Sequence, residues 1–427
     1  MMEISKLKGK RILILGFGRE GQDSFLFLKN EFPKLSMGVA DEKPRKDFSK
    51  DAQKLLRRAK THLGKDYLNS VKEYQVIIKA PGIPYHVIEP FLLKRHVVIS
   101  ATSIFFANCP GMIIGITGTK GKSTTASLVH SMLEKEGLPS YIIGNIGKAP
   151  LQFLRNALPD DIYVYELSSF QLENMTESPD VAVFLNLYKE HLNHHKTFAA
   201  YKKAKANITA YQTEIDFLVY NEKDEEVKKI AEKSKAQKLP FIPKAKNTSF
   251  LAPAEAAAVA ANLLGVSSKS IYQAIKEFKT LPHRLERVGE YKGITFYNDS
   301  LATIPEATIA ALDTLGKEVS TLIVGGFDRG VDYKKLAKRI AKCNIHTLIL
   351  FPTTGEAIWK HLAQEKHVIT PSFVDTMDNA VRIAYENTKK GDICLLSPAA
   401  SSFNLFRDYS DRGEQFTKAV IKYGTKQ

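Results

Sequence analysis

A segment near residue 120 contains the residue types that bind phosphate groups. It reads Gly115-Ile-Thr-Gly-Thr-Lys-Gly-Lys-Ser-Thr-Thr125 and lies between an apolar run and a segment with helical periodicity. Small residues let backbone N–H groups point into one concavity, and the N-terminus of the following helix adds partial positive charge. Lys122 can reach terminal phosphate oxygens, and the hydroxyl of Ser123 or Thr124 can take a magnesium position. The segment therefore predicts a nucleotide phosphate site, although Ile116 stands where the strict spacing G-x-x-x-x-G-K-S/T needs glycine.

Two side chains suited to a divalent cation follow the next apolar runs. Glu166 ends the run IYVYE, and His191 closes the segment Asn186-Leu-Tyr-Lys-Glu-His191 after VAVFL. Sites in open α/β sheets form at the carboxyl ends of the strands, so Glu166 can face the phosphate loop. A neutral imidazole can also bind a cation. Each residue alone has an ordinary alternative, since a glutamate after a strand can be a surface or capping residue and a lone histidine a structural one.

The N-terminal segment carries a second glycine-rich turn. Gly16-Phe-Gly-Arg-Glu-Gly21 follows the apolar run Arg11–Leu15, and Asp41 comes twenty residues after Gly21. This spacing fits a dinucleotide-binding fingerprint, in which glycines admit the diphosphate and the acidic residue contacts the ribose. The residues alone therefore leave an NAD-dependent oxidoreductase open.

Short apolar runs alternate with helix-like segments along the chain, which predicts an α/β fold. A chain of 427 residues is too long for one hydrophobic core. We expect an N-terminal Rossmann-like domain at residues 1–99, a central P-loop ATPase-type α/β domain at 100–280 and a C-terminal Rossmann-like domain at 281–427. The last boundary lies at the break Leu281-Pro-His-Arg284, and four strands are expected beyond it, in ITFYNDS, TLIVGGFD, TLILF and ICLLSPA.

The composition is that of a soluble globular protein, with 44% hydrophobic and 25% charged residues. The N-terminus lacks a signal-peptide pattern and no run of about 20 apolar residues occurs, so we expect a cytoplasmic enzyme without membrane attachment. Cys109, Cys343 and Cys394 have no metal-ligand spacing. The net charge of +15 favours anionic partners, of which nucleic acid and a polyphosphate substrate are two candidates. The basic residues are spread along the chain, which is typical of a solvated surface and does not require nucleic-acid binding.

The loop Thr117–Thr125 resembles the ATP loop of the Mur ligases and folylpolyglutamate synthases, which use T-G-T-x-G-K-S/T. The resemblance implies an ATP-dependent ligase with two magnesium ions. It places these residues at ATP: Gly118, Thr119, Lys120, Gly121, Lys122, Ser123 and Thr124. It makes Ser123, Glu166 and His191 magnesium ligands, although Glu190 and Asn193 stand where the family has aspartates. Lys205, fourteen residues after His191, matches the lysine that is carbamylated in the family and helps to hold the second magnesium.

The same resemblance implies that the first domain binds a ligand other than NAD. In the muramoyl ligases with this type of first domain, the fold holds the UDP part of the substrate. The residues implied at the UDP-sugar are Gly18, Arg19, Glu20, Asp41, Glu42, Pro81, Gly82 and Asn145.

Four segments of the third domain resemble the member of the family that uses D-glutamate. They are Leu281–Glu286, Asn298–Thr303, Gly325–Gly330 and Leu396–Phe403. The resemblance brings His283, Arg284 and Asp299 to ATP, and it implies these residues around glutamate: Thr303, Arg329, Ser402, Phe403 and Tyr409. A guanidinium such as that of Arg329 suits a dicarboxylate, because it binds carboxylate with two parallel hydrogen bonds.

Four positions depart from the family pattern. Leu301 and Ile304 replace a lysine and an asparagine near the amino-acid site, and Pro253 and Ala256 replace the asparagines that contact adenine. These changes leave the amino acid, including the choice between D- and L-glutamate, and the recognition of the base open.

The resemblance implies a reaction through an acyl phosphate, with Lys122, His191 and Lys205 as the catalytic set. ATP activates the carboxylate of UDP-N-acetylmuramoyl-L-alanine, and the amine of glutamate then forms the amide of a peptidoglycan precursor. The enzyme is expected to be a monomer, and its third domain must close onto ATP because Arg284 and Asp299 lie outside the domain of Lys122. The alternatives are a sibling ligase for L-glutamate or another amino acid, an NAD-dependent oxidoreductase, and a non-catalytic nucleotide-binding regulator.

Overall fold

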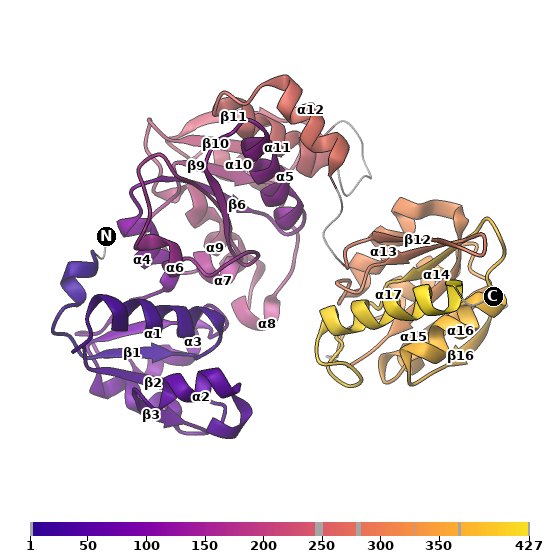
Figure 1. The fold of residues 1–427 in the computed structure, drawn as a ribbon, viewed down its shortest axis with the longest axis horizontal. Helices are drawn as coiled ribbons and strands as arrows, with labels where there is room; N and C mark the ends of the chain where they lie inside the picture. The colour runs from indigo at the N-terminus through magenta and orange to yellow at the C-terminus, as the bar shows by residue number, and fades with distance from the viewer. Residues whose placement is uncertain (1–2, 244–250, 279–282, 329, 366–368, 426–427) are drawn as a thin grey trace. The chain divides into compact units, whose positions relative to one another are not determined.

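The structure is a computed structural model that describes residues 3–243, 251–278, 283–328, 330–365 and 369–425. The described residues up to Phe278 form one compact unit, and those from His283 onward form a second. The first unit contains two sheets and the second unit contains one (Figure 1). Within the described ranges, no helix combines the length and apolarity needed to cross a membrane.

The N-terminal sheet has the strand order β3-β2-β1-β4-β5, and all its pairs are parallel. This is the order of the first five strands of a Rossmann sheet. Its strands are β1 Ile12–Leu15, β2 Met37–Asp41, β3 Lys60–Leu63, β4 Val76–Lys79 and β5 Val97–Ile99. Its helices are α1 Arg19–Glu31, α2 Lys50–Leu56, α3 Tyr85–Ile88 and α4 Ala101–Asn108. A Cβ on Gly21 would lie 2.0 Å from the carbonyl oxygen of Gly16, so the turn between β1 and α1 requires glycine.

The central sheet has the order β11-β10-β9-β6-β8-β7 and is also parallel. Its strands are β6 Met112–Thr117, β7 Ser140–Gly144, β8 Ile162–Glu166, β9 Val181–Phe184, β10 Phe217–Asn221 and β11 Gln237–Phe241. Its helices are α5 Lys122–Lys135, α6 Leu151–Leu154, α7 Ser169–Leu172, α8 Leu192–His195, α9 Phe198–Ala210, α10 Glu225–Ala231, α11 Leu251–Leu263 and α12 Ser268–Glu277. The alanine-rich α11 packs closely on α5, because small side chains let two helices approach.

The second unit has one sheet of order β12-β13-β17-β14-β15-β16, in which only the β12–β13 pair is antiparallel. Its strands are β12 Glu286–Tyr291, β13 Ile294–Asn298, β14 Val319–Gly325, β15 Thr347–Phe351, β16 Thr370–Phe373 and β17 Ile393–Leu396. Its helices are α13 Pro305–Leu315, α14 Lys334–Ile340, α15 Thr354–Leu362, α16 Met377–Asn387 and α17 Tyr409–Thr425.

The predicted α/β class with Rossmann-like sheets is confirmed, while the limits at residues 99 and 280 remain predictions. The four strands predicted in the last part are confirmed as β13, β14, β15 and β17, whereas the strands β12 and β16, at the edges of the sheet, were not predicted. No residue of β12 is fully buried, so it lacks the continuous apolar run by which a central parallel strand is recognised.

Candidate active site

The phosphate loop leaves the end of β6 and enters α5. Gly118 and Gly121 have φ values of 155° and 87°, which favour glycine. A Cβ on Gly118 would also lie 2.9 Å from Cβ of Leu185. Helix α5 begins at Lys122, so its unpaired N–H groups face the loop and supply partial positive charge there.

Asn186, a residue that the motif analysis did not single out, holds the phosphate loop from the neighbouring strand end. Its side-chain oxygen accepts from the N–H of Lys120 at 2.8 Å, and its amide donates to the carbonyl of Lys120 at 3.0 Å. The Asn186 carbonyl accepts from the N–H of Thr119 at 2.9 Å. The signal available in the sequence was its place directly after an apolar run, in the segment that ends at His191.

Two lysine side chains converge on the loop. Nζ of Lys122 donates to the carbonyls of Gly118 and Thr119, both at 3.0 Å. Lys205, on α9, donates to the same Gly118 carbonyl at 2.8 Å and to Oγ1 of Thr117 at 3.2 Å. Lys205 is only 1% exposed. Burial lowers its pKa far below the usual value, and the nearby Lys122 cation lowers it further.

Glu166 lies at the end of β8, beside β6, and is 1% exposed. Its Oε1 accepts from the side-chain amide of Asn145 at 3.2 Å. Its Oε2 is buried and has no hydrogen-bond partner among the described residues. A buried carboxylate oxygen without a partner is costly, and coordination of a cation would satisfy it. The position therefore fits a magnesium ligand.

His191 has a left-handed backbone with φ of 54° and stands at the start of α8. Its ring lies 4.9 Å from the ring of Phe170 between centroids, and its side chain is 44% exposed. Burial, with the Lys205 and Lys122 cations, lowers the pKa of His191 to about 4. The ring is thus neutral near pH 7, the form that ligates a cation or accepts a proton.

The predicted UDP residues occupy the N-terminal turn and its surroundings. Arg19 donates to the carbonyls of Gly144, Asn145 and Gly147, and so joins this turn to the loop after β7. Oε1 of the half-buried Glu20 accepts from Gln171 at 2.8 Å, and desolvation of the carboxylate raises the pKa of Glu20.

Asp41 uses one carboxylate oxygen in its own loop and the other to hold the turn after β1. One accepts from the N–H of Phe17 at 2.6 Å, and the other from the N–H of Lys43 at 2.9 Å. Gly18, Glu42 and Gly82 are exposed.

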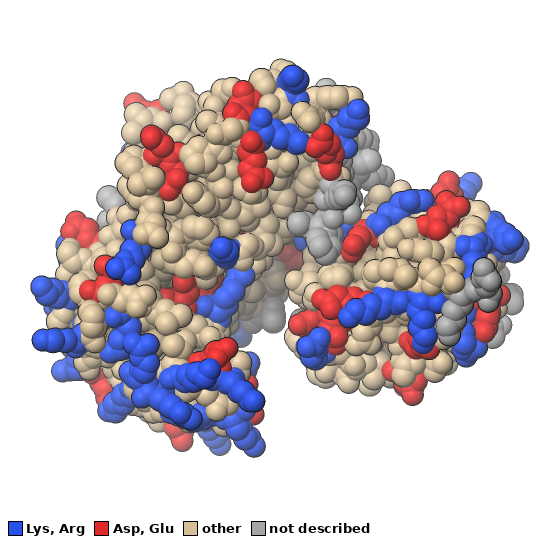
Figure 2. Space-filling view, viewed as in Figure 1, with Lys and Arg blue, Asp and Glu red and all other residues tan. Residues whose placement is uncertain are grey.

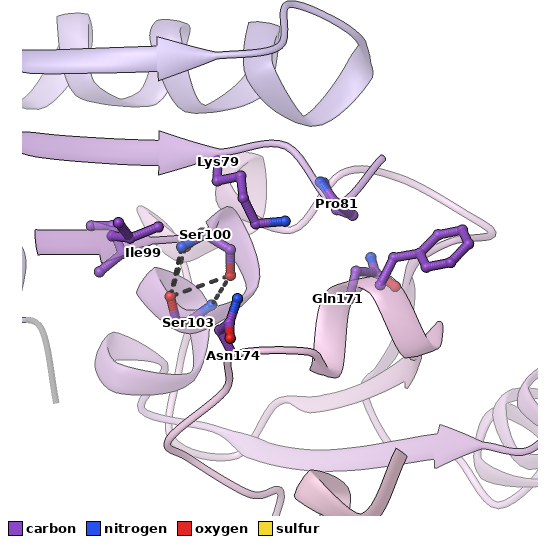
Figure 3. Close-up of a pocket in the computed structure, with 9 residues that line it drawn as sticks. Lys79, Pro81, Ile99, Ser100, Ser103, Gln171 and Asn174 are labelled. Carbon is purple, nitrogen blue, oxygen red and sulfur yellow. Dashed lines mark hydrogen bonds between the residues drawn. The ribbon is translucent and has the colours of Figure 1, made fainter. Parts of the chain in front are cut away.

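A pocket lies between the end of β4 and helix α7 (Figure 3). Pro81, predicted at the UDP-sugar, lines this pocket together with Lys79 from the same strand end and Gln171 from α7. Ser100 and Ser103 contribute hydroxyl groups, which hydrogen-bond to each other and to the backbone at the start of α4. The pocket is thus lined by the ends of β4 and β5, the start of α4, and α7 from the central part of the unit.

Basic side chains gather over α2 and β3 of the N-terminal sheet (Figure 2). The exposed basic residues in this segment are Lys43, Arg45, Lys46, Lys50, Lys54, Arg57, Arg58 and Lys60. Lys54 pairs with Asp51 at 2.9 Å and Lys60 with Glu73 at 2.6 Å. The remaining positive charge attracts anionic ligands to this side of the unit.

The second unit brings three predicted loops to one edge of its sheet. Strands β13, β17 and β14 are parallel neighbours, so their carboxyl ends lie side by side. The loops that follow them carry Thr303, Ser402 and Phe403, and they also include Arg329, which lies outside the described residues. Phe403 is 61% exposed, and Tyr409, which begins α17, is 43% exposed.

Two of the residues of this unit that are predicted to contact ATP make hydrogen bonds within the unit. Asp299 accepts from the N–H of Leu285 at 3.1 Å and from the hydroxyl of Ser397 at 2.8 Å. His283, with φ of 63°, lies 3.0 Å through Nδ1 from the amide of Asn298. Arg284 is half-buried.

Arg412 on α17 is fully buried beneath the predicted amino-acid loops. Its Nε donates to Oγ of Ser300 at 3.0 Å, and Nη2 donates to the carbonyls of Ser300 and Ala400 at 2.9 and 3.1 Å. A Cβ on Gly326 would lie 3.2 Å from Nη1. This residue was not predicted from the sequence, because an arginine in a polar helical segment is usually exposed and nothing in the local pattern indicates that the fold buries it.

Pro253 and Ala256, which replace the family's adenine-contacting asparagines, lie on α11. The carbonyl of Pro253 accepts from Oγ1 of Thr125 at 3.5 Å, and Ala256 is fully buried against α5. Ala256 therefore presents no polar group to a base.

A glycine-rich loop at the start of a helix, with the buried Glu166 and Lys205 and the partly exposed His191 nearby, suits a nucleotide-dependent ligase. The sequence matches the Mur ligase middle domain over residues 116–285 and the domain described as "Mur ligase, glutamate ligase domain" over residues 283–400. The chain therefore belongs to the Mur ligase family, and the resemblance noted from its motifs is confirmed.

Its relatives include the UDP-N-acetylmuramoylalanine–D-glutamate ligase of Geobacillus kaustophilus, which is 33% identical over 97% of this chain and 98% of the relative. The enzyme of the same name from Enterococcus hirae is 34% identical over 97% and 96%.

Solved structures share the fold at low sequence identity. The UDP-N-acetylmuramate–alanine ligase MurC of Thermotoga maritima has a TM-score of 0.61 at 14% identity and covers 97% of this chain and 100% of its own. The MurF ligase of Thermotoga maritima in complex with ADP has a TM-score of 0.60 at 17% identity, with 99% and 98% covered.

Proposed function

We propose that this chain joins D-glutamate to UDP-N-acetylmuramoyl-L-alanine with ATP, as a step of peptidoglycan precursor synthesis. The observation that carries the chemistry is the convergence of Lys122, Lys205 and Glu166 on one phosphate loop. The choice of substrates rests on the full-length relatives that bear this enzyme name. The enzyme acts in the cytoplasm as a monomer.

Magnesium would be held by Ser123, Glu166, His191 and a carbamylated Lys205. The unpartnered Oε2 of Glu166 and the neutral ring of His191 both suit a cation. Bound magnesium would neutralise charge on the triphosphate. Carbamylation joins the neutral Lys205 amine to the carbon of CO₂ and releases one proton, and the lowered pKa of this buried amine favours it.

Two displacement steps follow from this arrangement. An oxygen of the substrate carboxylate attacks the γ-phosphorus of ATP, the bond to the β-phosphate oxygen breaks, and ADP leaves behind an acyl phosphate. The amine of glutamate then attacks the acyl carbon, loses a proton and expels phosphate. Lys122 stabilises the charge that develops on the transferred phosphoryl group, and His191 is the candidate acceptor of the amine proton.

The N-terminal and C-terminal domains bind the UDP-sugar and glutamate, respectively. The N-terminal turn with Arg19 and Asp41 binds the UDP part, and Asn145 contacts the sugar phosphate near Glu166. Glutamate binds at the edge formed by the loops after β13, β17 and β14. These loops and the start of α17 contain Thr303, Arg329, Ser402, Phe403 and Tyr409. An arginine there complements a dicarboxylate.

The proposal is tested by phosphate release from ATP with UDP-N-acetylmuramoyl-L-alanine, magnesium and either D- or L-glutamate. We expect turnover with D-glutamate. Lys122→Ala should abolish phosphate release without lowering the melting temperature. Lys189→Ala, at an exposed position of the neighbouring loop, is the control and should leave phosphate release unchanged. Absence of turnover by the folded wild type would refute the ligase, and a preference for L-glutamate or another amino acid would refute the substrate.

A further inference from the structure

Glu173, His194 and His195 form a cluster of metal-binding side chains outside the predicted magnesium set. Glu173 follows α7, and both histidines belong to α8. Nε2 of His194 lies 3.4 Å from Oε2 of Glu173, and Nδ1 of His195 lies 3.8 Å from Oε1 of Glu173. One donor atom from each residue lies within 4.8 Å of the other two. Donors of one tetrahedral zinc ion are separated by about 3.3 Å when zinc bonds are near 2.0–2.2 Å, so small rotations would complete the geometry.

The rings are oriented and fixed as metal ligands are. Nε2 of His195 faces Oγ of Ser169 at 3.0 Å, which leaves Nδ1 free to face Glu173. A ligating histidine commonly uses its second nitrogen in this way, and the bond sets the ring orientation. The ring of Phe170 stacks on that of His194 with centroids 4.1 Å apart. Both histidines are only 5% exposed, so the cluster is screened from solvent.

We propose that Glu173, His194 and His195 form a binding site for a divalent transition metal, with Zn²⁺ as the ion of choice. Two imidazoles and one carboxylate are the donors of many zinc sites, whereas magnesium prefers oxygen ligands. In the ion-free protein Nε2 of His194 contacts Oε2 of Glu173 directly, and the ion would lie between these two atoms. A water molecule completes the coordination. The site does not depend on the proposed ligase reaction.

Lys79 gives this site a structural consequence. Its Nζ lies 3.8 Å from Oε2 of Glu173 and donates to the carbonyl of Ile83 at 2.7 Å. Lys79 ends β4 of the N-terminal sheet, whereas Glu173 and α8 belong to the central part of the unit. A ligating carboxylate is typically supported by a partner from outside the metal shell, and Lys79 supports Glu173 in this way as an ion pair. Zinc would therefore fasten α8 and the end of the N-terminal sheet to one carboxylate.

The test uses the full chain, stripped of metal with a chelator and titrated with Zn²⁺ by calorimetry. We expect one zinc per chain and a higher melting temperature with zinc. His194→Gln and Glu173→Gln should each weaken binding by more than about tenfold, and Ser169→Ala by about tenfold through loss of ring orientation. His346→Gln, at an exposed histidine of the second unit, is the matched control and should bind as the wild type does.

Cobalt(II) provides a second measurement in wild-type protein, because a tetrahedral site with nitrogen ligands gives an intense visible absorption band. The proposal is overturned if the wild type binds no zinc, or if His194→Gln and Glu173→Gln both bind it as tightly as the wild type. It is also overturned if His191→Ala abolishes zinc binding while His194→Gln retains it, since zinc would then occupy the predicted magnesium residues.

Discussion

Replacing Arg412 with Met tests whether one buried cation organises the amino-acid loops of the second unit. The guanidinium makes three hydrogen bonds to Ser300 and Ala400, and its Nη1 has no hydrogen-bond partner among the described residues. Ser300 follows Asp299 in the loop after β13, and Ala400 precedes Ser402 and Phe403 in the loop after β17. The side chain thus holds two loops that are predicted to bind glutamate.

The magnitude follows from two opposing effects. Hydrogen bonds from a charged donor contribute about 1.5–3 kcal/mol each, and three are lost in Arg412→Met. Removing a buried charge offsets this loss by about 1–4 kcal/mol. Met keeps most of the apolar volume, so cavity formation adds little. The three bonds together contribute about 4.5–9 kcal/mol, so after the offset we expect the free energy of unfolding of the second unit to fall by about 4 kcal/mol.

The assays are urea unfolding and phosphate release at saturating ATP and UDP-sugar with varied D-glutamate. We expect KM for glutamate to rise at least about tenfold, equivalent to about 1.4 kcal/mol of lost binding. Arg407→Met makes the same chemical change on the same segment, at a side chain that is 81% exposed and paired with Asp411. It should alter neither quantity. An unchanged unfolding midpoint and an unchanged KM in Arg412→Met would refute the reasoning.

Three further substitutions probe the first unit. Lys205→Arg keeps a long basic side chain but cannot form the carbamate, so phosphate release should fall at least about 100-fold; wild-type rates would exclude a carbamate role. Gly144→Ala should destabilise the protein by more than about 3 kcal/mol in urea unfolding, because Gly144 has φ of 102° and a Cβ there would lie 2.5 Å from the carbonyl oxygen of Glu166. Burial and the nearby His194 lower the pKa of His195 to about 4. Between about pH 4 and 6.5 the unfolded chain therefore binds more protons than the folded chain. The free energy of unfolding falls as the pH drops through that range. His195→Asn in metal-free protein should flatten this dependence, and an unaltered slope would contradict the neutral buried ring.

Local patterns determined most of the phosphate site from the sequence. Glycines at 118 and 121 reserve backbone conformations that other residues rarely adopt, and an apolar run before them with a helical segment after them sets the path of the loop. Glu166 was predictable for the same reason, because a residue at the carboxyl end of a parallel strand must face the edge where ligands bind. These features depend only on neighbouring residues.

The edges of the sheets were harder to predict. Strand β12 was missed because its side chains are only partly buried, and it pairs with β13 through a register shift between Arg287 and Gly289. Edge strands need less apolar sequence than central ones, so their pattern resembles that of a loop.

The partners of each side chain were decided only by the tertiary structure. Arg19 is 125 residues from Gly144 in the sequence, and Arg412 is 112 residues from Ser300, yet each pair is joined by a hydrogen bond. The cluster of Glu173, His194 and His195 likewise depends on how α7 and α8 pack. The sequence by itself determined the phosphate loop, the α/β alternation and the family to which the chain belongs. Burial and long-range packing decided which charges lie together, because chain folding brings distant residues into contact without leaving a periodic pattern in the sequence.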